Sequence, residues 1–234
     1  MQYFCDFPLI FFIYGYLLTA SILTKKWVMY ISIITKYNVD RKGGMVIDMK
    51  KALLIIDVQN FYFEEGPKRL YEPEKAASQI AKVLDYFRKT NQSVIHIQHI
   101  GKENEGKEEN NHSLAIHESV APIDGEIIIK KAYPSGFRET NLKEVLDELQ
   151  IEELVIVGMM SHMCVDTTVR AASNLGYKIT VLHDCCTTKA LIFQNTTIDA
   201  VTVHKAFMAS FEGFFAQVQS TQEYLDSVNL LQEE

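Results

Sequence analysis

From Lys50 onward, compact apolar runs alternate with stretches whose apolar residues recur every three or four positions. The apolar runs predict strands at residues 51–57, 93–100, 126–130, 153–158 and 178–184. The helical spacing predicts helices at residues 73–90, 140–150 and 164–176. Continuous apolar strands separated by amphipathic helices are typical of a mainly parallel sheet covered on both faces, so we predict an α/β fold with three α-β-α layers.

Several element ends and connections follow from local residue types. Thr140 is a plausible N-cap for the second helix, and Gly176 is suited to end the third. Residues 101–113 are polar and predict a loop. Residues 194–201 are expected to be helical or irregular, 201–206 is a candidate last strand, and 221–234 reads as a short terminal helix with a polar tail.

The first 48 residues follow a different pattern. Residues 7–23 form an uncharged apolar run, about as long as the shortest membrane spans, which need roughly 17 to 25 residues. Asp6 precedes the run with no Lys or Arg, which is unlike a signal peptide. We therefore divide the chain into an apolar extension (1–48), a main domain (49–220) and a tail (221–234).

Three explanations of the extension stay open. It is a membrane anchor, a buried or interfacial segment, or no part of the natural protein. We favour the last, because Arg41-Lys42-Gly43-Gly44 can be encoded by purine-rich codons of the kind that form a bacterial ribosome-binding site, and Met45 and Met49 follow directly. A membrane partner is expected only if residues 7–23 are translated and inserted.

Charge and cysteine content narrow the class of protein. The net charge of -7 argues against nucleic acid as a partner, because phosphate backbones are bound by clustered Lys and Arg. The four cysteines are Cys5, Cys164, Cys185 and Cys186, and their spacing suggests neither a disulfide framework nor a zinc site. A cytoplasmic protein without a cofactor fits this composition, and a membrane-anchored one is the alternative.

Reactive side chains fall where the predicted strands end. Ligands bind outside the carboxyl ends of the strands in an open parallel sheet. Asp57 ends the first strand, Lys130 and Lys131 end the third, and Asp184 ends the fifth. Cys164 follows the fourth strand after a short turn. We expect these groups to lie along one edge of the sheet, although any α/β domain places some charges there.

Cys164 is the sharpest candidate, because it stands where a helix is predicted to begin. A helix N-terminus favours a thiolate, and its N–H groups can stabilise an oxyanion. A nearby Lys would lower the thiol pKa further, and an Asp could carry the thiol proton. On position alone, a small buried apolar residue is an equally good interpretation of this cysteine.

Three blocks of sequence resemble one family. The blocks IIDVQNFY (55–62), KKAYPSGFRETNL (130–142) and GMMSHMCVDTTVRAASNLGY (158–177) look like the isochorismatase-like cysteine hydrolases, which include nicotinamidases and N-carbamoylsarcosine amidases. The resemblance extends from about Lys50 to about Phe214. It implies the isochorismatase-like hydrolase fold, with a six-stranded parallel sheet between helices.

The resemblance also implies a mechanism. Asp57, Lys131 and Cys164 match the family's catalytic triad, with Lys130 as the adjacent alternative to Lys131. The family's cis peptide would fall between Met159 and Met160, and the backbone N–H groups of Met160 and Cys164 would form the oxyanion hole. The implied reaction is hydrolysis of a carbon–nitrogen bond in a small-molecule amide through a cysteine thioester. A non-hydrolytic binding module or a thiol redox module on the same fold is the alternative.

Substrate contacts and assembly are less sharply defined. Phe61 and Phe137 could line the pocket or pack in the core, and the remaining pocket candidates are Gln59, Ser161 and His162. Nicotinamidases bind a metal after the second strand, but the histidines of that segment here lack the Asp-x-His arrangement, so we expect no metal. Family members are commonly dimers or tetramers, which makes a homodimer or homotetramer the expectation.

Overall fold

The structure is a computed structural model that describes residues 37–39, 45–47, 49–64, 68–102 and 111–233. The chain divides into two compact units, residues 50–233 and residues 1–49 together with residue 234. The smaller unit contains β1 (Tyr37–Val39) and β2 (Met45–Ile47), which pair antiparallel. The apolar run 7–23 lies outside the described residues. None of the described helices is both long and apolar enough to cross a membrane.

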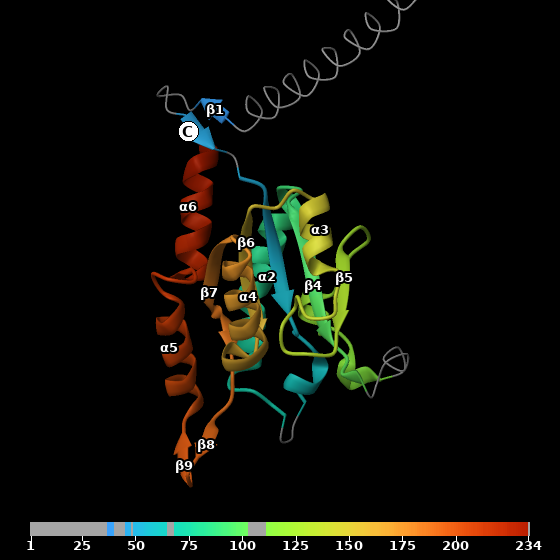
Figure 1. Cartoon of the computed structure of the whole chain (residues 1–234), viewed down its shortest axis with the longest axis vertical. Helices are drawn as coiled ribbons and strands as arrows, with labels where there is room; N and C mark the ends of the chain where they lie inside the picture. Colours follow the sequence, from blue (N-terminus) through green and yellow to red (C-terminus); the bar gives the residue numbers. More distant parts are fainter. Residues whose placement is uncertain (1–36, 40–44, 48, 65–67, 103–110, 234) are drawn as a thin grey trace, which may run out of the picture. The chain divides into compact units, whose positions relative to one another are not determined.

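The larger unit contains a six-stranded sheet in which every neighbouring pair is parallel. The strand order across the sheet is β10-β7-β6-β3-β4-β5 (Figure 1). The bounds are β3 (Lys51–Ile56), β4 (Ser93–His99), β5 (Ile127–Lys131), β6 (Glu153–Met159), β7 (Lys178–Thr187) and β10 (Gln217–Gln219). The predicted α/β fold with a parallel sheet is therefore confirmed.

Helices cover both faces of this sheet. The helices are α2 (Pro73–Lys89), α3 (Leu142–Glu148), α4 (Asp166–Asn174), α5 (Ala200–Phe211) and α6 (Thr221–Glu233). Short 3-10 turns lie at η1 (Asn60–Tyr62), η4 (His112–Leu114) and η5 (Glu118–Val120). One apolar cluster joins the sheet to α3, α4 and α5, and a second joins the other face to α2 and α6. The unit therefore has the three layers that the sequence pattern predicts.

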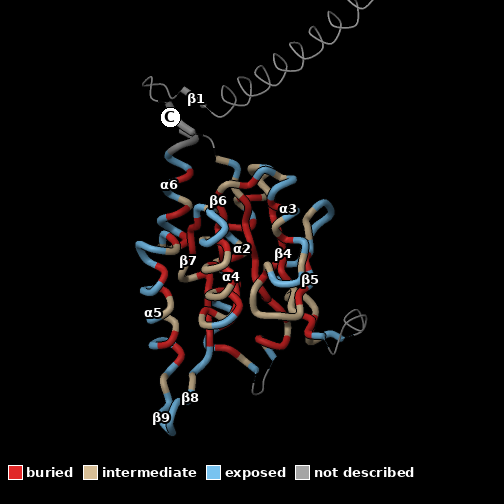
Figure 2. Tube along the Cα trace, viewed as in Figure 1, coloured by how far each residue is buried: buried red, intermediate tan, exposed pale blue. Residues whose placement is uncertain are grey.

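The central strands are buried: every residue of β6 and every residue of β3 except Lys51 is buried, and Figure 2 shows the middle of the sheet in red. Alternate residues of β3 face opposite layers, since Leu54 and Ile56 belong to the first cluster and Leu53 and Ile55 to the second. This double burial explains why the strands read as unbroken apolar runs in the sequence. It also leaves polar side chains room only at the ends of the strands.

Gly158 in β6 allows the two central strands to approach each other. Its φ is +125°, and a Cβ atom at this position would lie 2.1 Å from the backbone oxygen of Ile56. No side chain fits there without displacing backbone. The glycine therefore fixes the spacing of β3 and β6 beside the strand ends that carry Asp57 and Cys164.

The secondary structure predicted from the sequence differs from the structure in the region after β7. Residues 201–206 are not a strand but belong to α5, which begins after Asp199 because the Asp199 side chain accepts a hydrogen bond from Thr202 N at 3.0 Å. The stretch 194–201 is only partly helical or irregular: it contains the turn and second strand of a hairpin of β8 (Leu191–Phe193) and β9 (Thr196–Ile198), and only its last two residues belong to α5. The sixth strand of the sheet is β10, at 217–219.

Two smaller predictions also differ from the structure. Helix α3 begins at Leu142, and Asn141 rather than Thr140 occupies its N-cap position. Asp184 lies within β7, which continues to Thr187. Its carboxylate accepts hydrogen bonds from the backbone N and the hydroxyl of Thr221, both at 2.8 Å, at the start of α6. Asp184 thus anchors the last helix, and Tyr224 of that helix is buried in the second apolar cluster.

Candidate active site

Asp57 occupies the turn that follows β3. Its backbone has a φ of +51°, a left-handed conformation that few residues other than Gly, Asn and Asp adopt. Its backbone N donates to Ile97 O at 2.9 Å, which ties the turn to β4. Its side chain is completely buried, and no described group donates a hydrogen bond to its Oδ1 atom. A buried carboxylate with an open acceptor is suited to receive a proton from a nearby group.

Lys131 ends β5 and points to the same place. Its Nζ atom lies 2.7 Å from Asp57 Oδ2 and 3.2 Å from Cys164 Sγ. The side chains of Lys131 and Asp57 are both fully shielded from solvent. Because side chains alternate along a strand, the neighbouring Lys130 is exposed instead. Of the two lysines that the sequence offers, Lys131 is therefore the one that joins the cluster.

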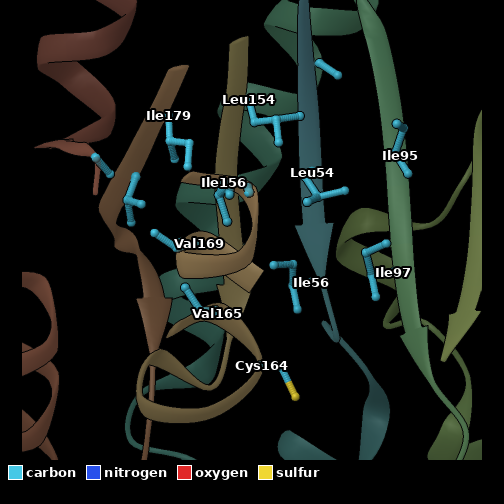
Figure 3. Close-up of a cluster of buried hydrophobic side chains, with 14 of the residues drawn as sticks. Leu54, Ile56, Ile95, Ile97, Leu154, Ile156, Cys164, Val165, Val169 and Ile179 are labelled. Atoms are coloured by element: carbon cyan, nitrogen blue, oxygen red, sulfur yellow. The ribbon is translucent and has the colours of Figure 1, made fainter. Parts of the chain in front are cut away.

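Cys164 lies in a π-helical turn, Ser161–Val165, directly before α4. Figure 3 shows it at the lower end of the first apolar cluster, beyond Ile56, with its sulfur directed away from that residue. The thiol is free and buried. The structure thus brings Asp57, Lys131 and Cys164 together at one edge of the sheet, as the resemblance predicts.

The resting state of the Cys164 thiol differs from the expectation of a thiolate. Burial raises its pKa to about 12, the charge of Asp57 and a hydrogen bond to that carboxylate add to the rise, and the ammonium of Lys131 opposes it. Desolvation dominates because an anion without water is costly. At neutral pH the sulfur is therefore protonated, and the carboxyl group of Asp57 is close to it.

The turn between β6 and Cys164 contains a cis peptide bond between Met159 and Met160, as the resemblance predicts. The backbone oxygen of Met160 accepts hydrogen bonds from Met163 N and Val165 N, which closes the turn around Cys164. The oxyanion-hole role of the Met160 and Cys164 N–H groups stays a prediction.

Gln59 connects two backbone segments beside the site through its side-chain amide. Its Oε1 atom accepts from His99 N at 2.8 Å, and its Nε2 atom donates to His99 O at 3.0 Å and to Leu114 O at 2.5 Å. The side chain is fully buried. Gln59 therefore ties the end of β4 to the 112–114 turn, and its contact with a substrate stays a prediction.

The two phenylalanine candidates pack against other aromatic rings. Phe61 is buried and meets Tyr62 edge-on, with ring centroids 4.2 Å apart. Phe137 is partly buried and stacks on Tyr177 at 6.4 Å. These contacts fit packing, and the role of both rings as pocket walls stays a prediction.

Ser161 and His162 have partners on β7, on the residue after it and on α5. Ser161 Oγ donates to Thr187 O at 3.2 Å and lies 2.8 Å from His204 Nδ1. The ring of His162 is hydrogen-bonded to Thr188 Oγ1 and meets Phe207 edge-on. Their contact with a substrate is likewise a prediction.

A cleft of about 330 Å³ lies beside the partners of Ser161, with His204, Cys186 and Tyr71 among its lining residues. Asp57, Lys131 and Cys164 do not line it. It is therefore separate from the cluster that carries the reactive groups.

Two residues near the cluster were missed by the sequence interpretation. His99 is one of the histidines after the second predicted strand to which the sequence assigned no role, yet its Nδ1 atom lies 3.3 Å from Lys131 Nζ. Tyr62 is buried, and the charges of Asp57 and Cys164 contribute, after desolvation, to raising its phenol pKa. Its hydroxyl therefore stays protonated beside them. The sequence places both near a strand end, since His99 is the last residue of β4 and Tyr62 follows β3, but the contact of His99 with Lys131 depends on strand register.

Within the described ranges, no three His, Cys, Asp or Glu side chains gather closely enough to hold a metal ion. His96 is instead paired with Glu126, at 2.9 Å between Nε2 and Oε2.

Comparison with known proteins gives one consistent result. A family model described as an isochorismatase domain matches residues 51–223. The uncharacterized isochorismatase family protein YddQ of Bacillus subtilis is 44% identical over 179 residues, which cover 76% of this chain and 99% of that protein. The ureidoacrylate amidohydrolase RutB of Acinetobacter baylyi is 30% identical over 110 residues, 47% of this chain and 41% of that one.

Solved structures agree. A putative isochorismatase hydrolase from Oleispira antarctica is 40% identical, with a TM-score of 0.72, and the match covers 78% of this chain and all of that chain. Sequence and fold therefore lead to the same assignment: this chain belongs to the isochorismatase family of hydrolases.

Proposed function

We propose that the protein hydrolyses a carbon–nitrogen bond of a small-molecule amide, with Cys164 as nucleophile, Asp57 as proton carrier and Lys131 as electrostatic partner. The observation that carries the proposal is the buried contact of Lys131 Nζ with both Asp57 Oδ2 (2.7 Å) and Cys164 Sγ (3.2 Å). A base, a cation and a nucleophile within hydrogen-bonding distance are what covalent acyl transfer needs.

The first half of the reaction forms a thioester. The protonated thiol gives its proton to the Asp57 carboxylate as the sulfur attacks the carbonyl carbon. Lys131 stabilises the developing thiolate charge, and the backbone N–H groups of Met160 and Cys164 hold the oxyanion. The carbon–nitrogen bond then breaks, the proton held by Asp57 passes to the departing nitrogen, and the acyl group stays on Cys164.

Water completes the cycle. Asp57, again ionised, takes a proton from a water molecule that attacks the thioester carbon. The sulfur leaves and recovers that proton, which releases a carboxylic acid and restores the resting thiol. The high pKa of Cys164, about 12, suits this scheme, because the sulfur is ionised only while a substrate carbon is there to accept it.

The substrate class rests on the reaction chemistry and on the relatives. A cysteine nucleophile beside a carboxylate suits amide carbons, and RutB, a relative, is by name an amidohydrolase. Phe61 and Phe137 are proposed to line the pocket, together with Gln59, Ser161 and His162. A homodimer or homotetramer and a cytoplasmic location remain predictions that accompany this proposal.

The test is a screen of small amides for ammonia release by the purified protein, with Cys164→Ala run in parallel. We expect release from at least one amide by the wild type and none from the variant, with unchanged circular dichroism. Retained release by Cys164→Ala would refute the role of the cysteine. The absence of release from every amide would favour the binding or redox module.

A further inference from the structure

The ammonium group of Lys131 has three N–H donors and three neighbours within reach. Asp57 Oδ2 and Cys164 Sγ are two of them, and His99 Nδ1, at 3.3 Å, is the third. The Lys131 side chain is fully shielded from solvent. A buried ammonium must have its donors satisfied, because an unpaired charged donor is costly to bury. The imidazole completes this set.

The contact fixes the protonation of the histidine ring. An ammonium has no lone pair, so His99 Nδ1 must accept the hydrogen bond and carry no proton itself. A protonated ring would instead place two positive charges 3.3 Å apart. His99 is therefore neutral in this arrangement, with its proton on Nε2, and it acts on Lys131 as an acceptor.

The position of the ring follows from strand register. His99 and Lys131 are directly paired residues of the parallel strands β4 and β5, which places their side chains on the same face. Gln59 then fixes the backbone of His99 by bonding both its N and its O. The backbone of His99 is therefore held by a residue of the segment after β3, while its ring reaches the lysine at the end of β5.

The other histidine of this strand has a different task. His96 lies three residues earlier, so its side chain faces the opposite layer, where its Nε2 atom pairs with Glu126. It supplies a natural control: a buried histidine of the same strand that is paired with Glu126 on the other layer.

We infer that His99 is a positioning residue that aims the Lys131 ammonium at Cys164 and Asp57, and that Gln59 holds His99 for this purpose. The effect of His99 on catalysis rests on the proposed function, whereas its positioning of Lys131 requires no substrate. Without the imidazole acceptor, the Lys131 ammonium is no longer held beside both the Asp57 carboxylate and the Cys164 sulfur. The Cys164 thiolate then loses its nearest positive charge.

Three variants test the inference through the rate at which iodoacetamide alkylates Cys164 between pH 7 and pH 10. His99→Leu removes the acceptor, and we expect about tenfold slower alkylation at each pH, the size of one charged hydrogen bond. His99→Asn places a carbonyl oxygen where Nδ1 stands and should restore most of the rate. His99→Gln places that oxygen one bond further out and should restore little.

His96→Leu is the matched control. It should lower the melting temperature, because it leaves buried Glu126 without one partner, yet keep the alkylation rate of Cys164. The inference is overturned if folded His99→Leu reacts within about twofold of wild type, or if His99→Asn is as slow as His99→Gln. Where amide turnover is measured, kcat should follow the alkylation order while KM changes little. The alkylation order with no amide turned over would support the positioning and refute the proposed function.

Discussion

Lys131 Nζ and Asp57 Oδ2 are 2.7 Å apart and completely buried, although 74 positions separate the two residues in the chain. The parallel register of β3, β4 and β5 creates this contact, since both residues stand at strand ends on one edge of the sheet. Two opposite charges without water stabilise each other, and neither tolerates the loss of its partner.

This dependence predicts an asymmetric effect on stability. Lys131→Met leaves the Asp57 carboxylate buried without its cation and should lower the free energy of unfolding by about 3 to 5 kcal/mol. Lys130→Met, the exposed neighbour in the same strand, should change it by less than about 0.5 kcal/mol. Urea unfolding of both variants measures the difference. Adding Asp57→Asn to Lys131→Met should recover part of the loss, and equal stabilities of the two single variants would contradict the account.

Asp57→Asn should separate thiol reactivity from turnover. The carboxylate raises the pKa of Cys164, so its removal lowers that pKa and increases the thiolate fraction at neutral pH. The thiolate fraction should rise about tenfold for each unit by which the pKa falls, and iodoacetamide should alkylate Cys164 about threefold to fourfold faster per unit, because a less basic thiolate is also a weaker nucleophile. Amide turnover should vanish, because no base remains to carry the proton.

The peptide that carries the label identifies the cysteine that reacts, with the buried Cys185 and Cys186 as internal controls. Slower labelling of Cys164 in Asp57→Asn would show that the carboxylate does not suppress ionisation of the thiol.

The pH profile of the wild type has a defined direction. Because burial raises the pKa of Cys164 to about 12, its neutral thiol dominates below that pH. Alkylation of Cys164 by iodoacetamide should therefore rise steadily from pH 7 to pH 10, without a plateau near pH 8. The rate constant at each pH checks this, and a plateau at neutral pH would indicate a thiolate at rest.

The close approach of β3 and β6 at Gly158 leads to a prediction about stability. Gly158→Ala forces a Cβ atom against Ile56 O at a φ of +125°, and should cost about 3 kcal/mol or more. Gly125→Ala is the matched control, since φ is +89° there and nothing lies within 4 Å of the added atom. It should cost only about 1 to 2 kcal/mol. Thermal unfolding compares the two, and equal losses would mean that the strand contact does not limit the packing.

The sequence predicted the sheet and the cluster because both depend on strong local signals. Doubly buried strands are unbroken apolar runs, and their ends are marked by Asp57, Lys131 and the turn before Cys164. The choice between Lys130 and Lys131 needed the family resemblance, and alternation along β5 gives the same answer in the structure.

The errors have physical causes. Residues 201–206 alternate β-branched and polar side chains like a strand, but the Asp199 cap and burial of Val203 favour a helix. Strand β10 has three residues, too few for a recognisable pattern. The thiol pKa depends on burial and on Asp57, neither of which helix position reveals. His99 became visible only through register, which brings β4 and β5 side by side.

The proposed reaction leaves an acyl group on Cys164 for part of each cycle, and mass spectrometry can detect this group. A reaction with an amide that the screen identifies is quenched in acid at successive times, and the digested protein is searched for bound acyl groups. We expect the peptide containing Cys164 to carry the acyl portion of the substrate, without its amine, during turnover. An acyl group on any other residue, or sustained turnover with no protein-bound acyl group at any quench time, would contradict it.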